Sequence, residues 1–216
     1  MAEVSPTDDD RPEEGHALGA LSPERLALAA YLGHQPARRL LGPASPPMGT
    51  LQSMRLGGDR PWRKAIRALG HEPAAVAACA IAELALRAYL AAPDAPLEVE
   101  ALARDAVGAL QSWRRDTRSE LRRAEVAERG AGFCLAVDVG GRFSKERGFR
   151  ASSLSRVVGR CYSVVLAPET RRHVRWLGEA ADETCRLLDV PGATVWEAVA
   201  AALLPYVLAP VGGTST

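Results

Sequence analysis

The sequence predicts an all-α protein of about seven helices, arranged as a compact bundle or a short stack. Three observations predict this fold class. Alanine, leucine, arginine and glutamate, which favour helices, are abundant throughout the chain. Apolar residues recur at a spacing of three and four along most segments. Serine or proline opens many of these segments and glycine or proline closes them, as is typical of helix ends.

Length and composition are those of an ordinary globular protein. The 216 residues suit one domain, or one domain with a small appendage. Apolar residues make up 47% of the chain and charged residues 25%, the usual balance of core and surface. The net charge of +1 argues against a general nucleic-acid coat, but it leaves room for a local basic patch.

The two ends of the chain differ from its middle. Residues 1–20 are an acidic arm that we expect to be disordered, because six carboxylates against one arginine give a net charge of −5. A single helical domain is expected over 21–209, with a loop at 42–60, followed by a flexible tail at 210–216. Neither a secretion signal nor a membrane-spanning stretch is recognisable, so we expect a cytoplasmic protein without a membrane partner.

The first helices have clear boundaries. Ser22 and Pro23 predict the start of the first helix, as N-cap and first helical residue, and Gly33 predicts its end. A second, short helix is predicted from Pro36 to Leu41, where a Gly-Pro pair follows.

A short motif occurs twice. The segment 32–37 returns 37 residues later as 69–74, with glycine, histidine and proline in the same places. A period of this length is typical of stacked helix pairs, so HEAT-like repeats are one interpretation and a common helix–helix joint is the other. We expect His34 and His71 in these joints to bond helix ends rather than a metal.

The middle of the chain contains one ambiguous stretch. Helices are predicted over 62–69, 73–91 and from 97 to about 129, the last with a kink or break near 116–117. The run 133–139 then resembles a strand, with a Gly-Gly turn and a partner strand, which gives a small β hairpin near 133–145. The alternative is a buried helix interrupted by the glycine pair.

Three more helices are predicted towards the C-terminus. They cover 154–166, 169–188 and 195–208. Ser152 or Ser153 is expected to cap the first of them, Pro168 to open the second, and Thr194 to cap the third.

The chain contains no recognisable catalytic motif. Neither the nucleophile elbow of hydrolases nor a phosphate-binding loop is found. The four cysteines are isolated, without a C-x-x-C pair or a histidine at ligand spacing, and are expected to be buried free thiols. Paired carboxylates such as Asp182-Glu183 are expected on a solvated helix surface. We therefore expect no catalytic residue, metal or cofactor.

Charge is uneven along the chain. Between residues 142 and 175 nine basic residues face two acidic ones, for a net charge of +7. Arginine binds carboxylates and phosphates bidentately, and tryptophan and arginine are the favoured anchors of protein interfaces. The alternative is a set of ordinary surface ion pairs. The candidate binding residues are Arg156, Arg160, Arg171, Arg172, Arg175 and Trp176.

Several short blocks carry a resemblance to a known group. They are residues 23–34, 78–83, 106–113, 195–198 and 204–206. Together they resemble a group of bacterial helical proteins, some of which are assigned to the immunity proteins of polymorphic toxin systems, and the resemblance extends in short blocks over about half of the chain. The resemblance implies a helical binding protein without catalysis, and it assigns no functional residues. The stretch 136–149 departs from the all-helical pattern of that group.

These observations lead to a hypothesis about function. We expect a non-enzymatic protein–protein interaction module, an adaptor or immunity-like binder in a bacterial conflict or regulatory system. Its partner is expected to be another protein, with the neighbouring genes as the first candidates, while the arm at 1–20 is a further anion that the arginines could hold. The alternative is a nucleic-acid-binding protein that uses the arginine-rich segment 142–175, and an enzyme with an unrecognised site comes third. The sequence does not indicate an oligomeric state.

Overall fold

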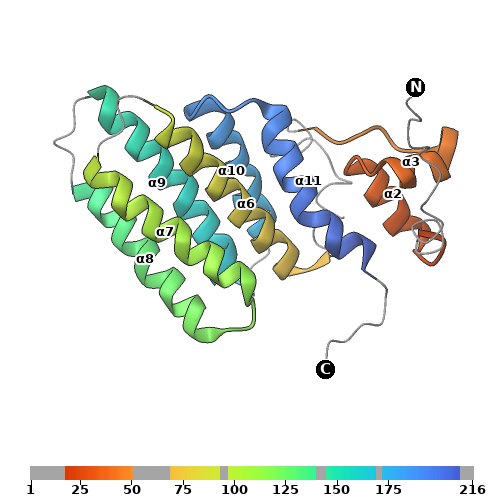
Figure 1. Cartoon of the computed structure of the whole chain (residues 1–216), viewed down its shortest axis with the longest axis horizontal. Coiled ribbons are helices and arrows are strands. Elements are labelled where there is room, and N and C mark those ends of the chain that lie inside the picture. Colours follow the sequence, from red (N-terminus) through yellow and green to blue (C-terminus); the bar gives the residue numbers. More distant parts are fainter. Residues whose placement is uncertain (1–17, 51–68, 93–96, 140–144, 169–171, 210–216) are drawn as a thin grey trace, which may run out of the picture. The chain divides into compact units, whose positions relative to one another are not determined.

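The computed structural model describes residues 18–50, 69–92, 97–139, 145–168 and 172–209 (Figure 1). All regular structure within these ranges is helical, so the all-α class is confirmed. The elements are α2 (Pro23–Tyr31), α3 (Gln35–Leu41), the 3₁₀ helix η1 (Gly42–Ala44), α6 (His71–Leu90), α7 (Leu97–Arg115), α8 (Glu120–Val139), α9 (Lys145–Leu166), α10 (His173–Leu187) and α11 (Gly192–Leu208).

The chain divides into two compact units. Unit 1 combines residues 1–48 with residues 204–216, and unit 2 comprises residues 49–203, so the boundary falls within α11. The single domain over 21–209 remains a prediction from the sequence. The predicted tail at 210–216 and the arm up to residue 17 lie outside the described residues. Leu18 is already buried.

Helix α6 forms the centre of unit 2. It packs against α7, α9 and α10, and α9 in turn packs against α8 and α10 (Figure 1). Most side chains of α6 are small and buried, from Ala74 to Cys79 without interruption. A helix that buries so much of its surface has to be covered by others on most sides, and its alanines let the neighbouring helices approach closely.

Helix α6 is also the one described helix that is long and apolar enough to cross a membrane. Length and composition alone give this result, and the core helix of a globular unit passes the same test. The most apolar window of α6 is 61% buried inside the structure, as expected for a core helix.

Helices α7 and α8 form a hairpin whose turn lies at residues 116–119, so the predicted break near 116–117 is confirmed. The hairpin packs on α9 through Tyr162, whose hydroxyl donates to the carbonyl oxygen of Ala106 at 2.8 Å. The tyrosine ring lies directly against the backbone of Gly130, where a Cβ atom would overlap it. Glycine is therefore required at this point of α8 for packing.

The predicted strand at 133–139 is wrong, because this run is the last part of α8. Phe133 and Val137 are 1% and 7% exposed, whereas Leu135 between them is 63% exposed. A strand would place all three side chains on one face, while a helix separates the middle one from the other two. The remainder of the predicted hairpin, 140–144, lies outside the described residues.

The starts of the three C-terminal helices differ from the predictions, and α6 begins at His71 rather than at Pro73. Helix α9 begins at Lys145, so Ser152 and Ser153 lie within it and do not cap it, and Ser153 is fully buried. Helix α10 begins at His173, four residues after the predicted start. Helix α11 begins at Gly192, before the expected cap at Thr194.

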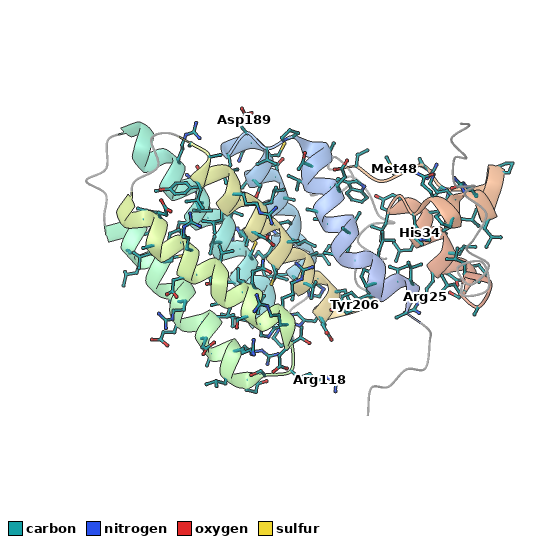
Figure 2. All side chains as sticks on the ribbon, in the orientation of Figure 1. Arg25, His34, Met48, Arg118, Asp189 and Tyr206 are labelled. Atoms are coloured by element: carbon teal, nitrogen blue, oxygen red, sulfur yellow. The ribbon has the colours of Figure 1, made fainter. Side chains whose placement is uncertain are left out.

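Unit 1 confirms the predicted helix ends. The hydroxyl of Ser22 accepts a hydrogen bond from the Arg25 backbone N–H, and Gly33 has the positive φ of 95° that ends α2. The guanidinium group of Arg25 donates to the carbonyl oxygen of Tyr206, at 3.2 Å, and to that of Ala209 (Figure 2). Such a cation satisfies carbonyls at the C-terminal end of α11 that lack helical partners.

The two histidines of the repeated motif both bond helix ends, as predicted. His34 Nδ1 accepts a hydrogen bond from the Ala37 N–H at the start of α3. His71 Nε2 lies 2.6 Å from the carbonyl oxygen of Val164, one of the last carbonyls of α9. This second bond requires the tautomer with its proton on Nε2.

Candidate functional site: the arginine layer of α9 and α10

The predicted basic residues gather where α9 packs against α10. Arg156 and Arg160 lie one turn apart on α9, which places them on one face of the helix, and both are exposed. Arg175 is exposed on the facing helix α10, and Arg172 is exposed in the turn that precedes it. We call these four residues, Arg156, Arg160, Arg172 and Arg175, the arginine layer.

One carboxylate connects the two helices beneath this layer. Glu179 Oε2 lies 2.9 Å from Arg160 Nε, and Glu179 Oε1 accepts a hydrogen bond from Arg175 Nε at 2.7 Å. The side chains of Arg160 and Arg175 are 44% and 64% exposed, whereas that of Glu179 is 15% exposed. The positive charge therefore faces solvent and the negative charge lies below it.

A second carboxylate follows one turn along α10. Burial raises the pKa of Glu183, and Glu179 raises it further, while Arg160, Arg156 and Arg186 lower it. The net direction is upward, so loss of water outweighs the nearby arginines at this position. We call Glu179 and Glu183 the carboxylate pair.

The α9–α10 seam thus has two pairs in register. Arg156 and Arg160 are four residues apart on α9, and the carboxylate pair is four residues apart on α10. Arg160 contacts Glu179, and Arg156 is close enough to Glu183 to lower its pKa. This register results from antiparallel packing of two helices with the same rise per residue.

The structure assigns different positions to the predicted binding residues. It brings Arg156, Arg160 and Arg175 together and places Arg172 at the start of α10. Trp176 is half-buried on α10, and its backbone N–H donates to the carbonyl oxygen of Arg172 at 2.9 Å. Arg171 lies outside the described residues.

The carboxylate pair was not among the residues predicted from the sequence. The expectation that carboxylates at 182–183 are simply solvated is wrong for Glu183, which is half-buried with a raised pKa. The spacing of four between Arg175 and Glu179 was a usable signal, because oppositely charged residues at that spacing contact each other on a helix. The contact with α9 depends on tertiary packing and has no local signal.

A second polar cluster lies where α6 and α10 begin. The rings of His71 and His173 meet edge to face, with centroids 6.2 Å apart. Burial lowers the pKa of His71, and the nearby His173 and Arg123 lower it further, against the bond to Val164 and the charge of Glu72. In the described part of the chain no three histidine, cysteine, aspartate or glutamate side chains are grouped to hold a metal ion.

The cysteines in the core of unit 2 are poor nucleophiles. Burial raises the pKa of Cys79 to about 12, and it also raises the pKa of Cys161, which is fully buried. A thiol reacts as its thiolate, so these two groups are suited to packing rather than catalysis. Cys134 and Cys185 are half-buried, and all four thiols are free.

Comparison with models of known protein families, with curated proteins and with solved structures finds no match to this chain.

Proposed function

We propose that the chain is a non-enzymatic protein-binding module, of the adaptor or immunity-protein kind, that docks an acidic partner on the arginine layer. The observation that supports this proposal is the difference in exposure at the α9–α10 seam. The guanidinium groups of Arg160 and Arg175 face solvent, whereas the carboxylate of Glu179 between them is largely covered. A partner that approaches this face meets the arginines first.

The supporting physics is that of protein interfaces. Arginine is enriched in interfaces because its planar fork binds carboxylates bidentately and because it is less strongly hydrated than lysine. Arg160 on α9 and Arg175 on α10 both contact Glu179, which keeps their guanidinium groups close together on one face of the two packed helices. The half-buried indole of Trp176, next in sequence to Arg175, offers an apolar anchor at the edge of the layer.

The test is complex formation with the products of the neighbouring genes. The chain is co-expressed with each of them, and a stoichiometric complex is sought by size-exclusion chromatography with light scattering. Replacing Arg156 and Arg160 by glutamine should weaken this complex about tenfold or more, since anchor arginines contribute roughly 1–2 kcal/mol each. The matched control replaces Arg104 and Arg115 by glutamine, which removes the same charge from exposed positions on α7.

Two results would contradict the proposal. If the complex tolerates the α9 substitutions as well as the α7 substitutions, the partner docks elsewhere. If no neighbouring product binds, but a gel shift at low salt shows oligonucleotide binding that falls steeply with salt, the arginine layer serves nucleic acid instead.

A further inference from the structure

We propose that Glu179 competes, in the unbound protein, with a carboxylate of the docked partner for Arg160 and Arg175, and that the partner presents an acidic helix. This inference rests on the proposed function, and it names both the ligand chemistry and the residue that competes with it.

Glu179 lies between two arginines, Arg160 and Arg175. Its two carboxylate oxygens contact Nε atoms from arginines of two different helices, at 2.9 and 2.7 Å. Each guanidinium carries five N–H donors, and Arg175 donates one of them to Glu179 Oε1, whereas Arg160 forms an ion pair with Glu179 Oε2 without a hydrogen bond. The arginine side chains are therefore already oriented for a carboxylate and keep donors for a second one.

The carboxylate of Glu179 is less exposed than the two guanidinium groups that it contacts. Glu179 lies beneath Arg160 and Arg175, so it can hold them without blocking their approach from solvent. When an external carboxylate binds the same arginines, the internal ion pairs must weaken or be shared. Glu179 thus acts as an internal competitor and lowers the affinity for the partner.

The spacing of the arginines on α9 indicates the kind of ligand. Arg156 and Arg160 are spaced four residues apart and face the carboxylate pair with the same spacing. A ligand that reproduces this pattern is a helix with carboxylates at positions i and i+4, since these project from one face.

The experiment uses a short fluorescein-labelled alanine-based peptide with glutamates at i and i+4, and its glutamine counterpart as the neutral probe. Anisotropy titrations at low salt compare the wild type with Glu179→Gln. We expect the variant to bind the acidic peptide about three- to tenfold tighter, the range that corresponds to release of one or two partly exposed ion pairs. Neither protein should bind the neutral probe measurably.

Glu125→Gln is the matched control, because it removes the same charge from an exposed position on α8. It should change the affinity less than about twofold, as expected for a distant, screened charge. Should Glu179→Gln fail to fold by circular dichroism, Glu179→Asp carries the test, since the shorter side chain keeps the charge but cannot reach both arginines. Glu179→Asp should increase the affinity for the acidic peptide less than Glu179→Gln does.

Three outcomes would overturn the inference. One is an unchanged or weaker affinity of the Glu179 variants, and another is an equal gain for Glu125→Gln. The third is the absence of peptide binding by any variant, including the case where a single-stranded oligonucleotide binds instead. Failure of the inference differs from failure of the proposed function, because a neighbouring gene product can still dock through Arg156 and Arg160 without displacing Glu179.

Discussion

At the scale of single residues, position within the bundle outweighs intrinsic preference. Glycine normally weakens a helix interior, yet Gly130 is required because Tyr162 packs on its backbone. Glutamate normally sits on the surface with its usual pKa, yet Glu183 is half-buried and its pKa is raised. Both residues are ordinary in the sequence and unusual only in the folded chain.

Substitution of the two glycines of α8 should have opposite effects. Gly130→Ala places a methyl group where the ring of Tyr162 lies, and overpacking of this kind costs roughly 1–3 kcal/mol. Gly132→Ala meets nothing within 4 Å and should stabilise the protein by up to about 1 kcal/mol. Urea unfolding of both variants measures the difference, and a stabilised Gly130→Ala protein would show that the ring packs elsewhere.

The raised pKa of Glu183 predicts a dependence of stability on pH. Because the pKa is higher in the folded than in the unfolded chain, the folded state holds more protons between the two values, and stability falls as pH rises through this window. Glu183→Gln should therefore be more stable than the wild type at neutral pH. The advantage should shrink on acidification and vanish below the unfolded value of about 4.5.

Urea midpoints of the two proteins across this pH range check the expectation. Glu125→Gln, at an exposed position, serves as the control for loss of a negative charge. A Glu183→Gln variant that is less stable than the wild type at neutral pH would mean that the nearby arginines outweigh burial.

At the scale of elements, local signals predicted several helix ends. Tertiary packing determined the secondary structure of 133–139 and the contacts between helices. Ser22, Gly33 and His34 act at helix ends as predicted, because caps depend on residues within one turn. The strand predicted at 133–139 failed because a short apolar run has no unique period. The arginines were predicted from charge alone, but the contact between Arg160 and Glu179 joins two helices and is invisible locally.

The helical state of 133–139 can be tested with two charged substitutions. Leu135→Glu should change the free energy of unfolding by no more than about 0.5 kcal/mol, because Leu135 faces solvent. Val137→Glu should cost about 3 kcal/mol or more, because it buries a carboxylate in the core. Equal effects in urea unfolding would indicate that both side chains share one face, as in a strand.

At the scale of the whole molecule, the centre of unit 2 is a thiol-bearing core. Cys79 on α6 and Cys161 on α9 are both fully buried, between helices that pack against each other. Reagents reach them only when these helices separate. Their protection therefore reports on opening of the unit as a whole, not on local fraying.

Thiol labelling should consequently occur in two phases. In native buffer Cys134 and Cys185 should react first with a maleimide, since both are half-buried, while Cys79 and Cys161 stay protected. All four should react together in concentrated urea. Peptide mass spectrometry assigns the sites, and early modification of Cys79 would contradict the packing of α6 against α9.

The bond from Arg25 to the carbonyl of Tyr206 has a consequence for synthesis of the protein. It joins residues 181 positions apart. Helix α2 is therefore synthesised long before the carbonyl group that Arg25 binds. Unit 1 cannot be completed until Tyr206 has been made, whereas α2 and α3 can pair early and the helices of unit 2 can pair as they are made. The order of synthesis therefore places closure of unit 1 after the pairing of its first two helices.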